Sequence, residues 1–162
     1  MAKTWQEKMM DKDGTPKIIK LEQRFPCYNA VHKMGAEIGD DIVLVNPREV
    51  EALMMRVQEG KLVTLKDICK TLAGQYSVKA CCTLTAGIFT MTAANAAEEM
   101  KSEGKVNDLP YWRTLKSHGQ LNPKYPGGIE QHKSLLEQEG FDIIRKGKKA
   151  FVKDYEKYRY RF

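Results

Sequence analysis

Residues 64–101 read TLKDICKTLAGQYSVKACCTLTAGIFTMTAANAAEEMK, and the expected architecture is built around them. Thr64 can cap a short helix, with Asp67 three residues later, a short-chain version of a capping box. We expect Gly74 to end that helix. A longer helix should span about residues 83–101, where a run of alanines favours helix. One side of it would be lined by Leu84, Ile88, Met91 and Ala94 or Asn95. A short helix, a connection and a longer helix are the pattern of a helix-turn-helix.

Another helix should precede this unit. It would begin at Asn46, with Pro47 in the first turn, where the missing N–H costs nothing, and end at Gly60. Its apolar residues share one face: Val50, Leu53, Met54 and Val57. The apolar run 42–45 fits either a short buried strand or an extended lead-in. The first 26 residues look irregular, although residues 17–21 could form a strand.

Further elements should follow the helical unit. Residues 112–116 could be a strand and residues 117–119 a turn, which is where a wing would lie. A helix is expected from about Gly128 to Glu139, and residues 141–152 have the pattern of a hairpin around a basic turn. The sequence therefore predicts a mainly α fold with small β elements, a winged helix-turn-helix with an N-terminal extension and a C-terminal β-hairpin and basic tail.

Charge is concentrated at the C-terminal end. The net charge is +6, and residues 145–162 carry eight basic and two acidic residues, interleaved with aromatic ones. The preceding residues 27–144 are near neutral, with thirteen basic and fifteen acidic residues. We divide the chain into an extension, 1–46, a domain, 47–144, and a tail, 145–162. The tail suggests a phosphate-rich or acidic partner, and a merely solvated tail is an equal alternative.

Composition excludes several classes of protein. Hydrophobic residues make up 42% and charged residues 30%, as in globular proteins, and no apolar run approaches a membrane span. Without an apolar signal region after Met1, a cytoplasmic protein is expected. The four cysteines form no Cys-x-x-Cys pair and have no histidine at ligand spacing, so we expect no metal, no cofactor and no structural disulfide. Cys81 and Cys82, near a helix N-terminus, could be nucleophilic or simply buried.

Six short motifs occur in order between residues 47 and 140. They are Gly60-Lys61-Leu62-Val63-Thr64, Gly87, Pro110-Tyr111-Trp112-Arg113, Gly119, Tyr125-Pro126-Gly127-Gly128 and Leu135-Leu136-Glu137-Gln138-Glu139-Gly140. This stretch resembles the DNA-binding domain of the alkylguanine-DNA alkyltransferases and their non-catalytic relatives, the alkyltransferase-like proteins. It is also similar to a bacterial group with a Pro-Tyr-Trp-Arg motif and a Lys-Tyr-Pro-Gly-Gly loop. The resemblance does not cover residues 1–46 or the tail.

The chain departs from this family where the chemistry occurs. The resemblance places Tyr111 at the position of the reactive cysteine, Trp112 at its histidine partner, and Glu139 at the glutamate that orients the histidine. A phenol without a neighbouring base is a poor acceptor of alkyl groups, so we expect no alkyl transfer. The family's phosphate-rotating tyrosine would fall near Leu65 and its arginine finger near Leu84.

The resemblance and the charge pattern together nominate two sets of residues. The set expected to contact DNA is Thr64, Lys66, Thr83, Leu84, Thr85, Arg113, Lys116, Lys146, Lys148 and Lys149. The set expected to border a base pocket is Tyr111, Trp112, Tyr125, Gly127, Gly128 and Glu139. Helix capping, core packing, an ordinary turn and an internal ion pair are alternative roles for these residues.

Three functions follow from these observations. The first is a non-catalytic DNA-binding protein that takes part in damage recognition or repair signalling. The second is a protein-protein or RNA-binding module, because the predicted long helix carries mostly Thr, Ala and Met instead of side chains that read base edges. The third is a cysteine-dependent enzyme that uses Cys81 or Cys82.

Overall fold

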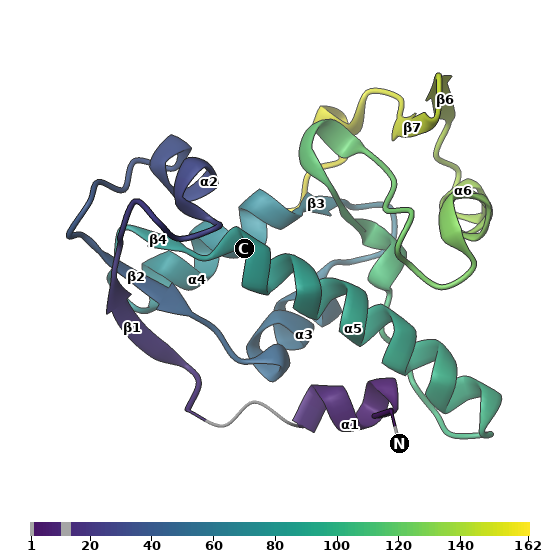
Figure 1. The fold of residues 1–162 in the computed structure, drawn as a ribbon. Coiled ribbons are helices and arrows are strands. Elements are labelled where there is room, and N and C mark those ends of the chain that lie inside the picture. Colours follow the sequence, from purple (N-terminus) through teal and green to yellow (C-terminus); the bar gives the residue numbers. More distant parts are fainter. Residues whose placement is uncertain (1, 11–13) are drawn as a thin grey trace.

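A 20-residue helix, α5 (Thr83–Ser102), crosses the computed structural model, which describes residues 2–10 and 14–162 (Figure 1). The other helices of this part are α1 (Trp5–Met10), α2 (Tyr28–Lys33), α3 (Pro47–Arg56), α4 (Leu65–Gln75) and α6 (Gly128–Gln138). The strands are β1 (Lys17–Lys20), β2 (Asp41–Leu44), β3 (Val63–Thr64), β4 (Ala80–Cys81), β5 (Thr114–Leu115), β6 (Ile143–Lys146) and β7 (Lys149–Val152). Short 3-10 turns span Tyr111–Arg113, Ser117–Gly119 and Tyr155–Tyr158. The fold is mainly helical with three small sheets, as predicted.

The inner face of α5 organises the main core. Ala86, Ala93 and Ala97 are fully buried and Phe89 nearly so, and the helix packs against α1, α3 and α4. Small side chains let neighbouring helices approach closely, and interiors are filled to near crystal density. The core therefore packs around one side of α5, and the opposite side of the helix lies outside this core.

Both predicted helix caps are confirmed. Asn46 accepts a hydrogen bond from Arg48 N, and Glu49 accepts from Asn46 N at 2.8 Å. Thr64 and Asp67 form the same reciprocal pair at the start of α4. Such caps satisfy backbone N–H groups that the first turn leaves free.

The C-terminal ends of α3 and α4 differ from the prediction. Gly74 was predicted to end α4, but the helix continues to Gln75 with Tyr76 as the C-cap residue. The preceding helix was expected to end at Gly60, whereas α3 ends at Arg56, and Gly60 lies in the following turn with φ +79°. A glycine near a helix end is only a statistical stop signal, and tertiary packing decides the boundary.

The N-terminal residues form more regular structure than expected. Residues 42–45 indeed contribute a buried strand: β2 pairs antiparallel with β1 and parallel with β4. The expectation that the rest of the first 26 residues is irregular is wrong for α1, whose Trp5 and Gln6 N–H groups donate to the Glu99 carboxylate on α5. Met1 and residues 11–13 of the predicted extension lie outside the described residues.

The C-terminal hairpin is confirmed as β6 and β7, which pair from Ile143–Val152 to Lys146–Lys149. The strand predicted over 112–116 is shorter. Its first part is the 3-10 turn Tyr111–Arg113, and only β5 extends alongside β3. Since β2 pairs with β4 and the tail bonds to Leu62, the three predicted parts of the chain are joined by backbone hydrogen bonds.

Replacing Thr64 with alanine should lower the free energy of unfolding by about 1 kcal/mol, because the Asp67 N–H loses its hydroxyl acceptor. Urea denaturation monitored by far-UV circular dichroism measures this change. Thr64→Ser retains the hydroxyl and should stay close to the parent protein. Equal loss in both variants would show that the methyl group, and not the cap, stabilises α4.

Candidate nucleic-acid interface

The outward face of α5 lines a groove of about 210 Å³. Leu84 and Ile88 project from the first turns of the helix with 50% and 47% of their surface exposed. The groove is completed by Leu65 of α4 and by the segment 115–125. The predicted apolar side of α5 is therefore real, and its Leu84 and Ile88 face solvent instead of the core.

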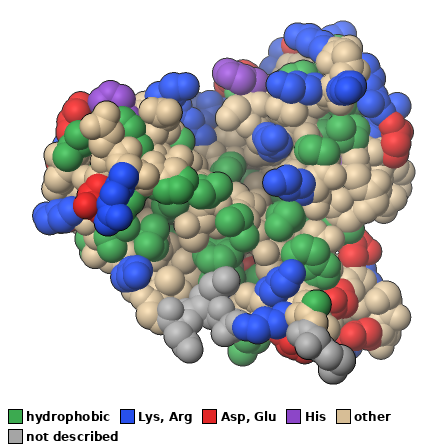
Figure 2. All heavy atoms as spheres, viewed as in Figure 1, with side chains coloured by type: hydrophobic (Ala, Val, Ile, Leu, Met, Phe, Trp, Pro, Cys, Tyr) green, Lys and Arg blue, Asp and Glu red, His purple; other side chains and the backbone are tan. Residues whose placement is uncertain are grey.

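Charged residues border this groove on one side. Lys116 and Lys124 line it and are exposed. Figure 2 shows hydrophobic side chains together across the centre of this face, and lysine and arginine side chains over the end that holds β6 and β7. Lys146, Lys148 and Lys149 of the hairpin are exposed. The groove therefore has apolar side chains at its bottom and cationic side chains along one edge.

Tyr125 forms part of the groove wall. It is 3% exposed, and its hydroxyl donates to the carbonyl oxygen of Thr114 at 2.8 Å. Burial raises the pKa of Tyr125, so the phenol stays neutral. Gly127 and Gly128, which follow it, have φ of +76° and +69°, a conformation that glycine adopts without strain. The tight turn into α6 therefore fixes Tyr125 against the groove.

Tyr111 lies inside the protein, with none of its surface exposed. Its hydroxyl donates to Glu98 Oε1 at 2.9 Å, and its ring meets those of Trp112 and Tyr125 edge-on, each with centroids 5.4 Å apart. Burial, followed by the contact with the Glu98 carboxylate, raises the pKa of Tyr111. The structure thus brings the three predicted pocket aromatics together as a packed cluster, and of these only Tyr125 lines the groove.

The Glu139 carboxylate lies beside this aromatic cluster and accepts several hydrogen bonds. Its side chain is 8% exposed and pairs with Arg113, with Arg113 Nε 3.0 Å from Oε2. The indole N–H of Trp112 and the Gly60 N–H, the latter at 3.1 Å, also donate to it. Arg113 further donates to the Val57 carbonyl at 2.8 Å. Arg113, nominated for DNA contact, is therefore engaged in the internal ion pair that was its alternative role.

His132 is a site residue that sequence reasoning missed. It is fully buried on α6, and its Nδ1 accepts from the Asn122 N–H at 3.0 Å. Nε2, 2.8 Å from the Trp112 carbonyl, must then donate, so the ring is neutral. Burial lowers the pKa of His132 to about 4. This histidine links the aromatic cluster to the loop that carries Asn122 and Lys124 at the groove, and its isolation in the sequence gave no signal.

The remaining nominated residues occupy separate places. Thr64 is buried as a cap, and Lys66 is exposed on α4. Thr83 and Thr85 are partly buried in the first turn of α5, where Thr85 Oγ1 lies 3.3 Å from the sulfur of Cys82.

The four cysteines are all buried. Cys81 belongs to the main core and Cys82 to a smaller cluster beneath α2. Burial raises the pKa of Cys27, which neighbours Cys82, to about 12. Burial and a high pKa both disfavour the thiolate that a nucleophilic cysteine requires.

Across residues 2–10 and 14–162, no three His, Cys, Asp or Glu side chains come together as a potential metal site. In the same residues, no helix has both the length and the apolar character that crossing a membrane requires.

The short capped helix, the long helix with its outward groove and the aromatic cluster beside it belong to a protein with the alkyltransferase-like fold. The crystal structure of S. pombe ATL in complex with DNA matches with a TM-score of 0.51 and 17% identity, covering 71% of this chain and 94% of that chain. S. pombe Atl1 in complex with damaged DNA containing O6-carboxymethylguanine has a TM-score of 0.49, 19% identity and the same coverage. The chain matches no family model and, at a significant level, no curated protein. The resemblance is thereby confirmed at the level of the fold.

The low pKa of His132 predicts that the protein loses stability in mild acid. In the unfolded chain the imidazole takes up a proton near pH 6.5, whereas the folded protein resists protonation down to about pH 4. Stability is therefore full above pH 6.5 and falls as the pH drops toward 4, by about 1.5 kcal/mol between pH 6.5 and 5.

Urea unfolding at several pH values across this range measures the slope. His132→Gln should flatten it, while His118→Gln, a change at an exposed histidine, should leave it intact. A slope that persists in the His132 variant would assign the proton uptake to another group.

Proposed function

We propose that this protein binds DNA through the groove on α5 without transferring an alkyl group. The observation that carries the proposal is the pair of exposed apolar side chains, Leu84 and Ile88, beside the exposed cations Lys116 and Lys124. A structure of the same fold, S. pombe ATL, is in complex with DNA. Recognition of damaged DNA and repair signalling, which the resemblance implies, are part of this proposal.

In this proposal α4 and α5 act as the two helices of a helix-turn-helix within a domain of residues 47–144. The segment 114–121 and the β6–β7 hairpin would flank the nucleic acid as a wing. Lys66, Lys146, Lys148 and Lys149 would contact phosphates, together with the threonine hydroxyls at the start of α5. The exposure of these four lysines supports the assignment.

The chemistry of α5 favours a particular kind of contact. Its groove-lining residues include Leu84, Gly87, Ile88 and Met91, and none of these offers a hydrogen bond from its side chain to a base edge. Apolar side chains contact thymine methyl groups or insert between base steps, whereas lysines neutralise phosphates without regard to sequence. We therefore expect affinity to depend strongly on salt and weakly on sequence.

The environment of Tyr111 supports the proposed absence of alkyl transfer. A nucleophile must be deprotonated and reach its substrate. The Tyr111 phenol is buried, its pKa is raised, and its hydroxyl donates to Glu98. At the histidine position Trp112 donates to Glu139 and cannot serve as a base.

Fluorescence anisotropy with a labelled duplex should show tight binding at low salt that weakens steeply as salt rises. Replacing both Lys116 and Lys124 with glutamine should reduce the slope of log K against log salt by about 2, because two phosphate contacts are lost. A matched control is Lys17→Gln with Lys20→Gln, which removes the same charge from β1, a strand that contributes no residue to the groove.

Three outcomes would contradict parts of this proposal. Absence of binding to duplex or single-stranded DNA at low salt would reject DNA as the partner. Equal slopes in the groove variant and the control would place the DNA elsewhere. Equal affinity for plain duplex and duplex containing alkylated guanine would reject damage recognition alone.

Incubation with DNA containing alkylated guanine should leave the protein mass unchanged, because Tyr111 and the four cysteines are buried. Mass spectrometry of the intact protein and of its Tyr111 peptide measures this. An alkyl adduct on Tyr111 would overturn the non-catalytic assignment. An adduct on Cys81 or Cys82 would support the cysteine-dependent alternative instead.

A protein or RNA partner is the second candidate, favoured by the apolar surface of Leu84 and Ile88. Exposed apolar residues that lie together often mark protein interfaces. The anisotropy experiment separates the candidates when an RNA strand of the same sequence is included. Preferential RNA binding, or failure to bind any nucleic acid, would favour this second function.

A further inference from the structure

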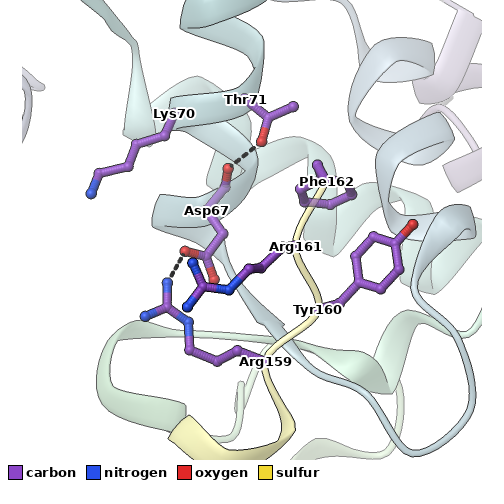
Figure 3. A pocket seen from close by; sticks show the side chains of 7 residues that line it. All are labelled: Asp67, Lys70, Thr71, Arg159, Tyr160, Arg161 and Phe162. Atoms are coloured by element: carbon purple, nitrogen blue, oxygen red, sulfur yellow. Dashed lines mark hydrogen bonds and ion pairs between the residues drawn. The ribbon is translucent and has the colours of Figure 1, made fainter.

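The tail of the chain lies beside β3 in an extended conformation. Two backbone hydrogen bonds of 2.8 Å join Leu62 to this segment. Side chains alternate along an extended segment, so Tyr160 and Phe162 point one way and Arg159 and Arg161 the other. The two aromatic rings pack against the core. The two arginines consequently lie on the side of the tail that faces α4, as Figure 3 shows.

These arginines line a pocket of about 160 Å³ with residues of α4. Asp67 and Lys70 contribute to its wall, and Phe162 closes one end. Arg56 lies over the ring of Phe162 at 5.2 Å from its centroid, which fixes that end further. The pocket is thus built where the tail meets α4.

Both oxygens of the Asp67 carboxylate in this pocket already have partners. Asp67 Oδ1 is 2.5 Å from the Arg159 guanidinium, and Oδ2 accepts the Thr64 N–H at 2.9 Å as part of the helix cap. Lys70 and Arg161 have no ion-pair partner among the described residues, and both are exposed at the pocket. Two positive charges therefore remain uncompensated in one concave site.

We propose that this pocket binds a phosphoryl group between Lys70 and Arg161. A guanidinium presents a planar fork of N–H donors that matches two phosphate oxygens, and a lysine ammonium adds a compact charge. A phosphate monoester carries nearly two negative charges at neutral pH, so it can pair with both cations. The Arg159–Asp67 pair holds the tail in place without consuming the other two cations.

This site is separate from the α5 groove. Leu65 lines the groove, whereas Asp67, Lys70 and Thr71 line the pocket. At 100° per residue these three positions lie roughly 140–240° around α4 from Leu65, on the opposite side of the helix. The two sites share no lining residue. An experiment can therefore reject one of the two sites without affecting the other.

Thermal unfolding of the full chain in inorganic phosphate, compared with chloride at equal ionic strength and pH, tests the proposal. Phosphate should raise Tm in a saturable manner, because a ligand that binds the folded state stabilises it. Lys70→Met combined with Arg161→Gln should raise the apparent Kd for phosphate by about tenfold or more. The control variant, Lys17→Gln with Lys20→Gln, removes the same charge from β1, which contributes no residue to the pocket, and should bind phosphate as the parent does.

Two results would overturn the site: a Tm that rises no further in phosphate than in chloride, or an equal rise in the parent and the Lys70/Arg161 variant. Oligonucleotides of one sequence, with and without a 5′-phosphate, identify the carrier of the phosphoryl group. Preference for the phosphorylated strand that disappears in the variant points to a nucleic-acid end. Equal binding of the two strands, with phosphate binding intact, points to a free phosphorylated molecule.

Discussion

One buried carboxylate, that of Glu139, fixes the parts of the protein that frame the groove. Arg113, the indole N–H of Trp112 and the Gly60 N–H all donate to it. Burying a charge costs several kcal/mol unless a partner and further hydrogen bonds compensate, and here both are present. Because Arg113 also bonds to Val57 O, the end of α3 is joined to α6 and to the turn that carries the aromatic cluster. The wall of the groove depends on this network.

The helix α5 gives the groove its other wall by having two different faces. Alanines and Phe89 on the inner face allow α1, α3 and α4 to pack closely. Leu84 and Ile88 on the outer face remain about half exposed, at 50% and 47%. A helix with apolar residues all round shows little directional contrast in its sequence. Position within the fold, and not residue type, therefore distinguishes the core face of α5 from the face available to a partner.

How much of the fold could be predicted from the sequence depends on whether an interaction joins residues that are close together in the chain. The helix starts at Asn46 and Thr64, the capping box at Thr64 and Asp67, and the hairpin were predicted correctly because each joins residues a few positions apart. Helix α1 has a local cap, in which Thr4 Oγ1 accepts from the Glu7 N–H, but its six residues are too few to show a helical period, and its bonds to Glu99 reach 93–94 residues along the chain. The parallel pairing of β2 with β4 is also non-local. Local hydrogen bonds leave a signature in sequence spacing, whereas long-range ones appear only when the chain has folded.

The predicted site residues show the same contrast between local and long-range interactions. The resemblance grouped Tyr111, Trp112, Tyr125 and Glu139, and in the structure the three rings pack together with Glu139 beside Trp112, but sequence could not show whether they bordered an open pocket. His132, buried between the Trp112 carbonyl and the Asn122 N–H, had no spacing signal at all. Its two hydrogen bonds are to backbone atoms, which any sequence can supply, so only the folded positions reveal them.

The aromatic cluster fills the place where the resemblance puts the reactive cysteine. A cysteine at position 111 would need solvent access and a base, whereas a tyrosine fills the same space with a ring that packs against Trp112 and Tyr125. Its hydroxyl still has to be satisfied, and Glu98 on α5 provides the acceptor. The two parts of the proposed function therefore rest on different regions of the protein. The phenol lies in the interior, whereas Leu84 and Ile88 lie on the outer face of α5.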